Sequence, residues 1–301
     1  MNSRSSAALP ILAILLGATS WGIIWYPFRV IEAGGLPSPV STLITYAVAV
    51  LVGGVVFFRA WHEFRGNGGW LLAIGLMAGI TNVSYLVAIM QAEVVRIVLL
   101  FYLAPFWTVP IARLILAERL TPTGLAVMLV ALSGAVVMLW RPELGMPAPR
   151  NADEWLGLIA GFTFAVCNVL VRAARHVSTE AKSLSGCIGV IIVALPVALL
   201  SGPAPSTWPG LATPHLFLLI ALGVTLIATS IALQFGLTHL SANHAAVIML
   251  FELIVAAVAA HYLAGEVTRQ QDWLGGAMIV VAGLFATLAE ARAARMRASP
   301  I

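Results

Sequence analysis

The sequence is poor in charge. Only 9% of its 301 residues are Asp, Glu, Lys or Arg, whereas 61% are hydrophobic, and the mean hydropathy is +1.00. A soluble domain carries roughly 25% charged residues, so this chain cannot cover a surface that faces water. Its apolar runs are continuous over about 20 residues and do not alternate with period two, as the strands of an outer-membrane barrel would. We therefore expect an all-α integral membrane protein.

Cysteine is also scarce. Cys167 and Cys187 both fall inside apolar runs, where a thiol behaves as a small core residue, so neither a disulfide nor a metal site is predicted. The sequence has no Walker A motif and no recognisable cluster of metal ligands, so no cofactor is expected. The net charge of +4 does not indicate a nucleic-acid partner, because the basic residues lie in short loops and at the C-terminus.

Hydrophobic windows of about 20 residues predict ten transmembrane helices. They cover residues 9–30, 38–59, 69–90, 94–116, 122–140, 154–173, 184–201, 214–236, 242–264 and 271–290. Most connections are short, so successive helices should pack as antiparallel neighbours. Lys and Arg are more frequent in the loops on the side of the N-terminus, which predicts that both termini are cytoplasmic, with the protein in the inner membrane.

One pattern occurs twice along the chain. A shift of 148 residues places Gly75 on Gly223, Thr81 on Thr229 and Glu118 on Glu266, and a shift of 143 places Trp21 on Phe164. The chain therefore divides into two five-helix halves, residues 1–145 and 146–301. Five is odd, so the second half must enter the membrane from the opposite side. Inverted repeats of this kind are typical of secondary transporters, which bind their substrate in a central cavity.

Short motifs recur in order along both halves: Ser20-Trp21-Gly22, Ala104-Pro105, Glu118-Arg119-Leu120-Thr121, Ser241-Ala242 and Gly265-Glu266-Val267-Thr268. With these motifs the chain resembles the drug/metabolite transporter superfamily, and within it the ten-helix EamA-type transporters. The resemblance implies transport of small molecules, often efflux of amino acids or other metabolites. The segment around Tyr102 is similar to that of aromatic amino-acid exporters of the family, although these commonly carry Trp where Ala104 stands.

Glu252 is the sharpest candidate for a functional residue, because it lies near the middle of the ninth span. An ionised acid at that depth costs roughly 2.5–3.5 kcal/mol, so it should face the bundle interior or a wet cavity, or stay protonated. It is either a proton-coupling carboxylate or an anchor for a substrate ammonium group; the alternative is a structural, protonated Glu. His244 lies on roughly the same helix face and is the second proton-coupling candidate, with an interfacial His as the alternative.

The predicted substrate-binding residues are aromatic and polar side chains of the membrane interior, although ordinary helix packing would explain any one of them. They are Trp21, Trp25, Asn82, Tyr85, Tyr102, Phe164, Asn168, Gln234 and Glu252. Pro105 and Pro110 interrupt the fourth span and predict a bend, either static or flexing in transport. Glu118 and Glu266 occupy matching repeat positions, and either gate through ion pairs or simply pair with a local Arg, Arg119 or Arg269.

The sequence thus predicts ten transmembrane helices in two inverted repeats around a central cavity. We interpret it as a secondary active transporter that exports small metabolites, amino acids or amphipathic organic compounds, by alternating access. Proton coupling, facilitative uniport and a channel-like pore are alternatives. Sugar-phosphate or nucleotide-sugar exchange is disfavoured because the basic residues lie near span ends, and an enzyme is disfavoured because no catalytic constellation accompanies Glu252. The expected partners are the substrate, the bilayer and, if coupled, protons; monomer and homodimer remain open.

Overall fold

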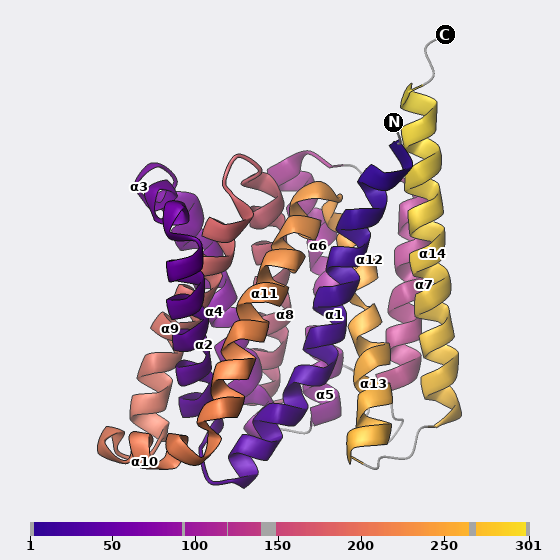
Figure 1. The fold of residues 1–301 in the computed structure, drawn as a ribbon. Helices are drawn as coiled ribbons and strands as arrows, with labels where there is room; N and C mark the ends of the chain where they lie inside the picture. Colours follow the sequence, from indigo (N-terminus) through magenta and orange to yellow (C-terminus); the bar gives the residue numbers. More distant parts are fainter. Residues whose placement is uncertain (1–2, 92–93, 119, 140–148, 265–268, 299–301) are drawn as a thin grey trace.

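The computed structural model describes the whole chain except residues 1–2, 92–93, 119, 140–148, 265–268 and 299–301. The regular elements within the described residues are all helical, and they form one bundle (Figure 1). The first helix begins and the last helix ends at the same end of this bundle, which we call the terminal end; the opposite end is the far end.

Eight helices run uninterrupted along the bundle: α1 (Ser3–Ala33), α2 (Ser38–Val56), α4 (Gly68–Gln91), α7 (Pro122–Leu139), α8 (Ala152–Ala173), α9 (Thr179–Ser201), α11 (Leu216–His239) and α14 (Gln270–Ala298). Two further crossings each consist of two helices: α5 (Val94–Phe101) with α6 (Ala104–Leu116), and α12 (Ala242–Met249) with α13 (Phe251–Ala264). The connections contain η1 (Phe58–His62), α3 (Glu63–Gly66), η3 (Pro205–Thr207), α10 (Trp208–Ala212) and η4 (Thr213–His215).

The predicted ten-helix membrane fold is confirmed. Eight segments of the described chain are long and apolar enough to cross a membrane, and α5–α6 and α14 complete the set. Helix bounds agree with the hydrophobic windows to within a few residues, except at the start of α1, the end of α14 and the start of α9. This helix begins five residues before its window, with Ser178 as its N-cap accepting a hydrogen bond from the Ala181 amide at 3.2 Å. Its first turns are polar but buried, which a hydropathy window cannot detect.

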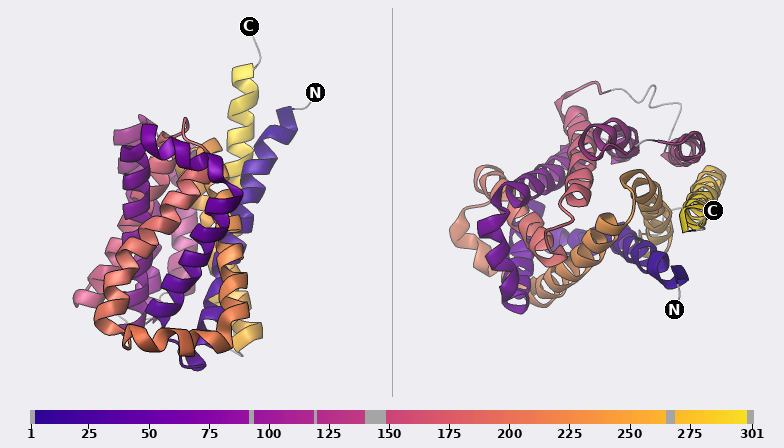
Figure 2. Two further views of the ribbon diagram at one scale, coloured as in Figure 1. Left: turned by 60° about the vertical axis from the view of Figure 1, so that its left-hand side comes forward. Right: turned by 90° about the horizontal axis from the view of Figure 1, so that it is seen from above.

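The packing of the first five crossings recurs in the second five. Helix α4 lies along α8 and α9, and correspondingly α11 lies along α1 and α2. Helix α6 contacts α8, and correspondingly α13 contacts α1. Helices α7 and α14 lie side by side at one edge of the bundle, as the view from above shows (Figure 2).

Glycines permit the closest of these helix contacts. A Cβ atom added to Gly75 or Gly79 on α4 would collide with the backbone of α9. A Cβ atom added to Gly161 on α8 would collide with the carbonyl oxygen of Phe101, at the end of α5. Small residues that let backbones approach in this way are the usual means by which membrane helices associate.

Both broken crossings are interrupted at equivalent positions. In the first, Tyr102 and Leu103 separate α5 from α6, and the Leu103 amide donates to the Leu100 carbonyl at 3.3 Å instead of continuing the α-helical pattern. In the second, Leu250 separates α12 from α13, and its amide donates to the Val247 carbonyl at 3.2 Å. The shift of 148 residues aligns Tyr102 with Leu250, so the two breaks match.

The two prolines of the first broken crossing occupy different positions in the helix. Pro105 lies in the first turn of α6, so it marks the start of a new helix after the break, a position where its missing N–H is harmless. Pro110 lies inside α6, which continues through it. The second break contains no proline and was not predicted.

Candidate functional site

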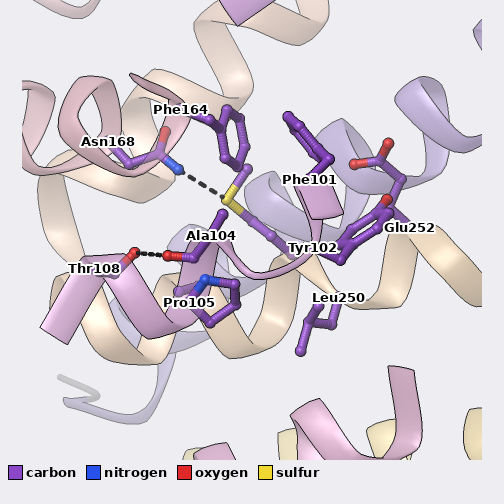
Figure 3. A pocket seen from close by; sticks show the side chains of 11 residues that line it. Phe101, Tyr102, Ala104, Pro105, Thr108, Phe164, Asn168, Leu250 and Glu252 are labelled. Atoms are coloured by element: carbon purple, nitrogen blue, oxygen red, sulfur yellow. Dashed lines mark hydrogen bonds between the residues drawn. The ribbon is translucent and has the colours of Figure 1, made fainter. Parts of the chain in front are cut away.

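A small cavity lies where the two helix breaks meet α8 (Figure 3). The α5–α6 crossing contributes five of the eleven lining residues, α8 contributes two and α12–α13 contributes four. The lining residues are Phe101, Tyr102, Ala104, Pro105, Thr108, Phe164, Asn168, Ala246, Met249, Leu250 and Glu252. The free volume is about 20 Å³, which is room for a water molecule but not for a metabolite. We call this conformation, in which the cavity is too small for a substrate, the closed state.

Glu252 and Tyr102 form the polar end of this cavity. Glu252 lies in the first turn of α13, directly after the second helix break. Its carboxyl group lies close enough to the hydroxyl of Tyr102, from the first break, for the two groups to interact. The position that the repeat aligns with Glu252 is Ala104, which lines the same cavity. The two breaks thus contribute an acid from one half and a small apolar residue from the other.

Aromatic rings form one side of the cavity. The ring of Phe101 lies 5.0 Å from that of Tyr85, 5.2 Å from that of Phe164 and 5.4 Å from that of Tyr102, measured between centroids. These separations are typical of favourable aromatic pairs. Tyr85, on α4, stands behind Phe101 and is not part of the lining, but it is close enough to interact electrostatically with Glu252.

Two polar side chains complete the cavity. The amide nitrogen of Asn168 donates to the sulfur of Met249 at 3.6 Å, which joins α8 to α12 (Figure 3). The hydroxyl of Thr108 donates to the carbonyl of Ala104 one turn earlier, at 3.0 Å. The lining residues that the structure describes include no Lys, Arg or His.

Four of the nine predicted substrate-binding residues line this cavity: Tyr102, Phe164, Asn168 and Glu252. Pro105, predicted as a kink, also lines it, whereas Pro110 does not. Their roles in binding and gating stay predictions. The sequence interpretation did not single out Phe101, Thr108 or Met249. Thr108 follows Ala104 by one helical turn, and Met249 aligns with Phe101 under the repeat shift, so both could have been found from those relations.

The other predicted residues lie elsewhere in the bundle in this closed state. The indole nitrogen of Trp25 donates to the carbonyl of Gly22 at 2.9 Å, and Trp21 packs against the main core. The side-chain oxygen of Asn82 accepts from the hydroxyl of Tyr46 on α2 at 3.0 Å. Gln234 is buried on α11, outside the lining. These residues could not be placed from the sequence, because a helix that is apolar on all sides does not indicate which face points to the cavity. His244 is buried near the start of α12, also outside the lining.

A separate polar cluster joins several helices at the terminal end. Glu118, just after α6, accepts from Nε of Arg172 at 3.3 Å and from the amide of Ala242, the first residue of α12, at 3.1 Å. Arg172, near the end of α8, also donates to the carbonyl of Thr238 on α11 at 2.6 Å. The side chains of Arg172 and Glu118 are only 13% and 18% exposed. This cluster, Glu118–Arg172–Thr238–Ala242, fastens the end of α6 to three helices of the second half.

Lys182 reinforces the same region. It is fully buried, and its ammonium group donates to the hydroxyl of Thr238 and to the carbonyls of Val171 and Ala174 at the end of α8, at 3.5 and 3.4 Å. A cation at this position donates to carbonyls at the C-terminal end of the helix, where the α-helical hydrogen bonds stop; the Ala174 carbonyl also accepts from the Val177 amide at 3.2 Å.

The local pairings considered for Glu118 and Glu266 stay predictions, because Arg119 and Glu266 lie outside the described residues. Among the described residues, Glu118 contacts Arg172, which is distant in sequence. Arg29, which the repeat shift aligns with Arg172, is exposed at the far end of α1.

A bundle of ten membrane crossings, two of them broken around an interior acid, defines a multi-pass membrane transporter. The chain belongs to the EamA-like transporter family, whose profile matches residues 8–140 and again residues 153–288. The family assignment suggested by the sequence motifs is therefore confirmed. Membership of this family identifies the protein as a membrane transporter, and it specifies neither the substrate nor the direction of transport.

Two curated relatives carry the description of an uncharacterized transporter. One, from Archaeoglobus fulgidus, is 26% identical over 286 residues, which covers 88% of this chain and 99% of the relative. The other, from Pseudomonas aeruginosa, is 25% identical over 246 residues, which covers 75% and 76%. A solved crystal structure is similar with a TM-score of 0.71 and 22% identity, covering 95% of this chain and 99% of that one. At this identity the likeness supports the fold alone.

Proposed function

We propose that this protein is a gradient-driven carrier that exports small metabolites, amino acids or amphipathic organic compounds, across the inner membrane. The observation that carries the proposal is the meeting of both helix breaks and the membrane-interior acid Glu252 at one cavity. Irregular backbone at membrane depth is tolerated only where it is enclosed by protein or lines a cavity. In many secondary transporters such breaks form the substrate site near the bilayer midplane.

Alternating access is the mechanism that we infer. The recurrence of helix contacts supports two five-helix repeats, residues 1–145 and 146–301, and their odd number of spans makes them inverted. The cluster Glu118–Arg172–Thr238–Ala242 ties the halves together at the terminal end. The cavity is too small for a metabolite in this state, so loading a substrate requires the two halves to move apart at one end. We assign the terminal end to the cytoplasm, following the distribution of Lys and Arg.

Glu252 is the residue to which we assign coupling. A carboxyl group in a cavity that supplies no cation carries a proton or pairs with a cationic group of the substrate, because an unpaired charge there is costly. Exchange of the proton for the substrate would couple export to the proton gradient. Without this exchange the same fold would work as a uniporter.

Counterflow in proteoliposomes tests the proposed function. The purified full chain is reconstituted with each compound of a metabolite panel inside, and uptake of the same labelled compound is followed. A carrier gives saturable uptake that depends on the internal compound, whereas a pore gives linear flux without counterflow. Absence of saturable counterflow for every compound of the panel contradicts the proposal. The Glu252→Gln variant then tests coupling: proton antiport predicts that its flux no longer responds to an imposed pH gradient.

A further inference from the structure

The charge of the cavity points to the kind of substrate that it accepts. Its lining has one acid, Glu252, and no Lys, Arg or His among the eleven lining residues. Tyr85 and Tyr102 are the titratable groups that act on Glu252 from neighbouring helices. A bound anion would therefore meet a carboxyl group and no balancing cation, while a bound cation would meet a ready partner.

Hydrogen-bond donors around the cavity are largely occupied within the protein. The hydroxyl of Tyr102 lies beside the carboxyl group of Glu252, that of Thr108 donates to the carbonyl of Ala104, and one N–H of the Asn168 amide donates to the sulfur of Met249. These side-chain donors thus already face acceptors within the protein. A ligand that brings N–H groups suits such a site, whereas a carboxylate or phosphate would lose its hydration without replacement.

Several backbone amides at the two helix starts beside the cavity already have acceptors within the chain. Backbone N–H groups at a helix N-terminus ordinarily favour anions. At the start of α6, Pro105 has no N–H, and the amides of Phe106 and Trp107 both donate to the Leu103 carbonyl, at 2.9 and 3.4 Å. At the start of α13, the Leu253 amide donates to the Leu250 carbonyl at 3.1 Å.

The aromatic wall favours the same ligand. Phe101 and Phe164 line the cavity beside Tyr102, on the side opposite the carbonyl and hydroxyl groups of α6 (Figure 3). Aromatic ring faces attract organic cations and pack well against flat or compact apolar groups. The wall can therefore hold the apolar body of a molecule whose charged group reaches Glu252.

We propose that this site selects small organic cations, namely amines with a compact apolar or aromatic body, over zwitterions and anions of the same shape. The proposal rests on the proposed function and narrows it, since it favours amines over amino acids. In the bound complex the ammonium group pairs with the Glu252 carboxylate and the apolar body lies against Phe101 and Phe164. A substrate carboxylate finds no cation among the lining residues and meets the Glu252 carboxylate instead.

Charge-matched probes test this selection in the proteoliposomes described above. Phenethylamine, phenylalanine and 3-phenylpropionate share one ring but carry a positive, a zwitterionic and a negative charge. Tryptamine, tryptophan and indole-3-propionate repeat the comparison on a larger ring. For at least one ring the amine should give counterflow or binding about tenfold stronger than either matched compound, which corresponds to about 1.4 kcal/mol.

Two substitutions identify the side chain that causes the preference for amines. Glu252→Gln should lose the preference for the amine, whereas Tyr102→Phe, which keeps the carboxyl group, should retain it. The melting temperature and the elution volume in size-exclusion chromatography check that each variant is folded. If the Glu252→Gln variant does not fold, the comparison of the matched compounds on the wild-type protein decides the proposal. Saturable flux that favours zwitterions or anions, or equal flux of the matched compounds, overturns this inference but leaves the carrier function intact. No saturable flux for any compound of the wider panel overturns the carrier function itself.

Discussion

Removal of the charge on Glu118 should loosen the terminal end of the bundle. Glu118 receives two hydrogen bonds, from Arg172 and from the amide of Ala242, in a largely buried setting. Hydrogen bonds to charged groups contribute about 1.5–3 kcal/mol, and neutral ones about 0.5–1.5 kcal/mol. The Glu118→Gln variant keeps one acceptor oxygen but loses the charge, so we expect a loss of about 1–2 kcal/mol, which changes the ratio of closed to open molecules roughly 5–30-fold.

Hydrogen–deuterium exchange of the purified protein in nanodiscs measures this change. The amide of Ala242 is protected by Glu118 in the closed state, so peptides that cover the start of α12 should exchange roughly 5–30-fold faster in the variant. The matched control is Asp153→Asn, which removes one negative charge in the first turn of α8, at the far end. It should leave exchange at α12 unchanged. Equal exchange rates in Glu118→Gln, the control and the wild type would refute the claim that this cluster holds the terminal end of the bundle together.

Three further substitutions test the packing around the site. Gly161→Ala should lower the free energy of unfolding by about 1–3 kcal/mol, because the added Cβ collides with the Phe101 carbonyl. The control Gly283→Ala, whose Cβ meets open space, should leave it unchanged. Thermal denaturation compares the two variants. Pro105→Ala restores an amide that can donate to the Phe101 carbonyl, so it should straighten the first break and slow counterflow while the protein stays folded. Lys182→Met removes the ammonium group that donates to the carbonyls of Val171 and Ala174 and to the hydroxyl of Thr238. It should cost about 1–3 kcal/mol, compared in the same assay with the exposed Arg175→Met.

Much of the fold could be predicted because the membrane imposes it. Lipid requires long continuous apolar helices, and these appear directly as hydrophobic windows. The first break was indicated by Pro105, since proline cannot continue a helix at that point. The second break has no such marker: Leu250 and Phe251 are ordinary helix residues. Its position follows only from the repeat, which aligns it with the first break.

The sequence could predict those residues of the candidate site that are marked both by their depth in the membrane and by their position in the repeat. Glu252 stood out because an interior acid is costly, and the repeat aligns it with Ala104; both line the cavity. Trp21 and Trp25 were predicted from their helical spacing and from the repeat, which aligns them with Phe164 and Asn168. Spacing does not fix the rotation of a helix that is apolar on all sides, and in the closed state these residues pack elsewhere.

Protection of a thiol inside the cavity tests the central claim most directly. Thr108 lines the cavity, so a Thr108→Cys variant, in a background with Cys167→Ser and Cys187→Ser, places one reactive group there. Ser206→Cys, in the exposed turn η3, serves as the control. With a membrane-permeant thiol reagent, a compound that shows counterflow should slow labelling at position 108 and leave labelling at position 206 unchanged. Equal labelling rates at position 108 with and without a saturating transported compound would contradict the assignment of this cavity as the substrate site.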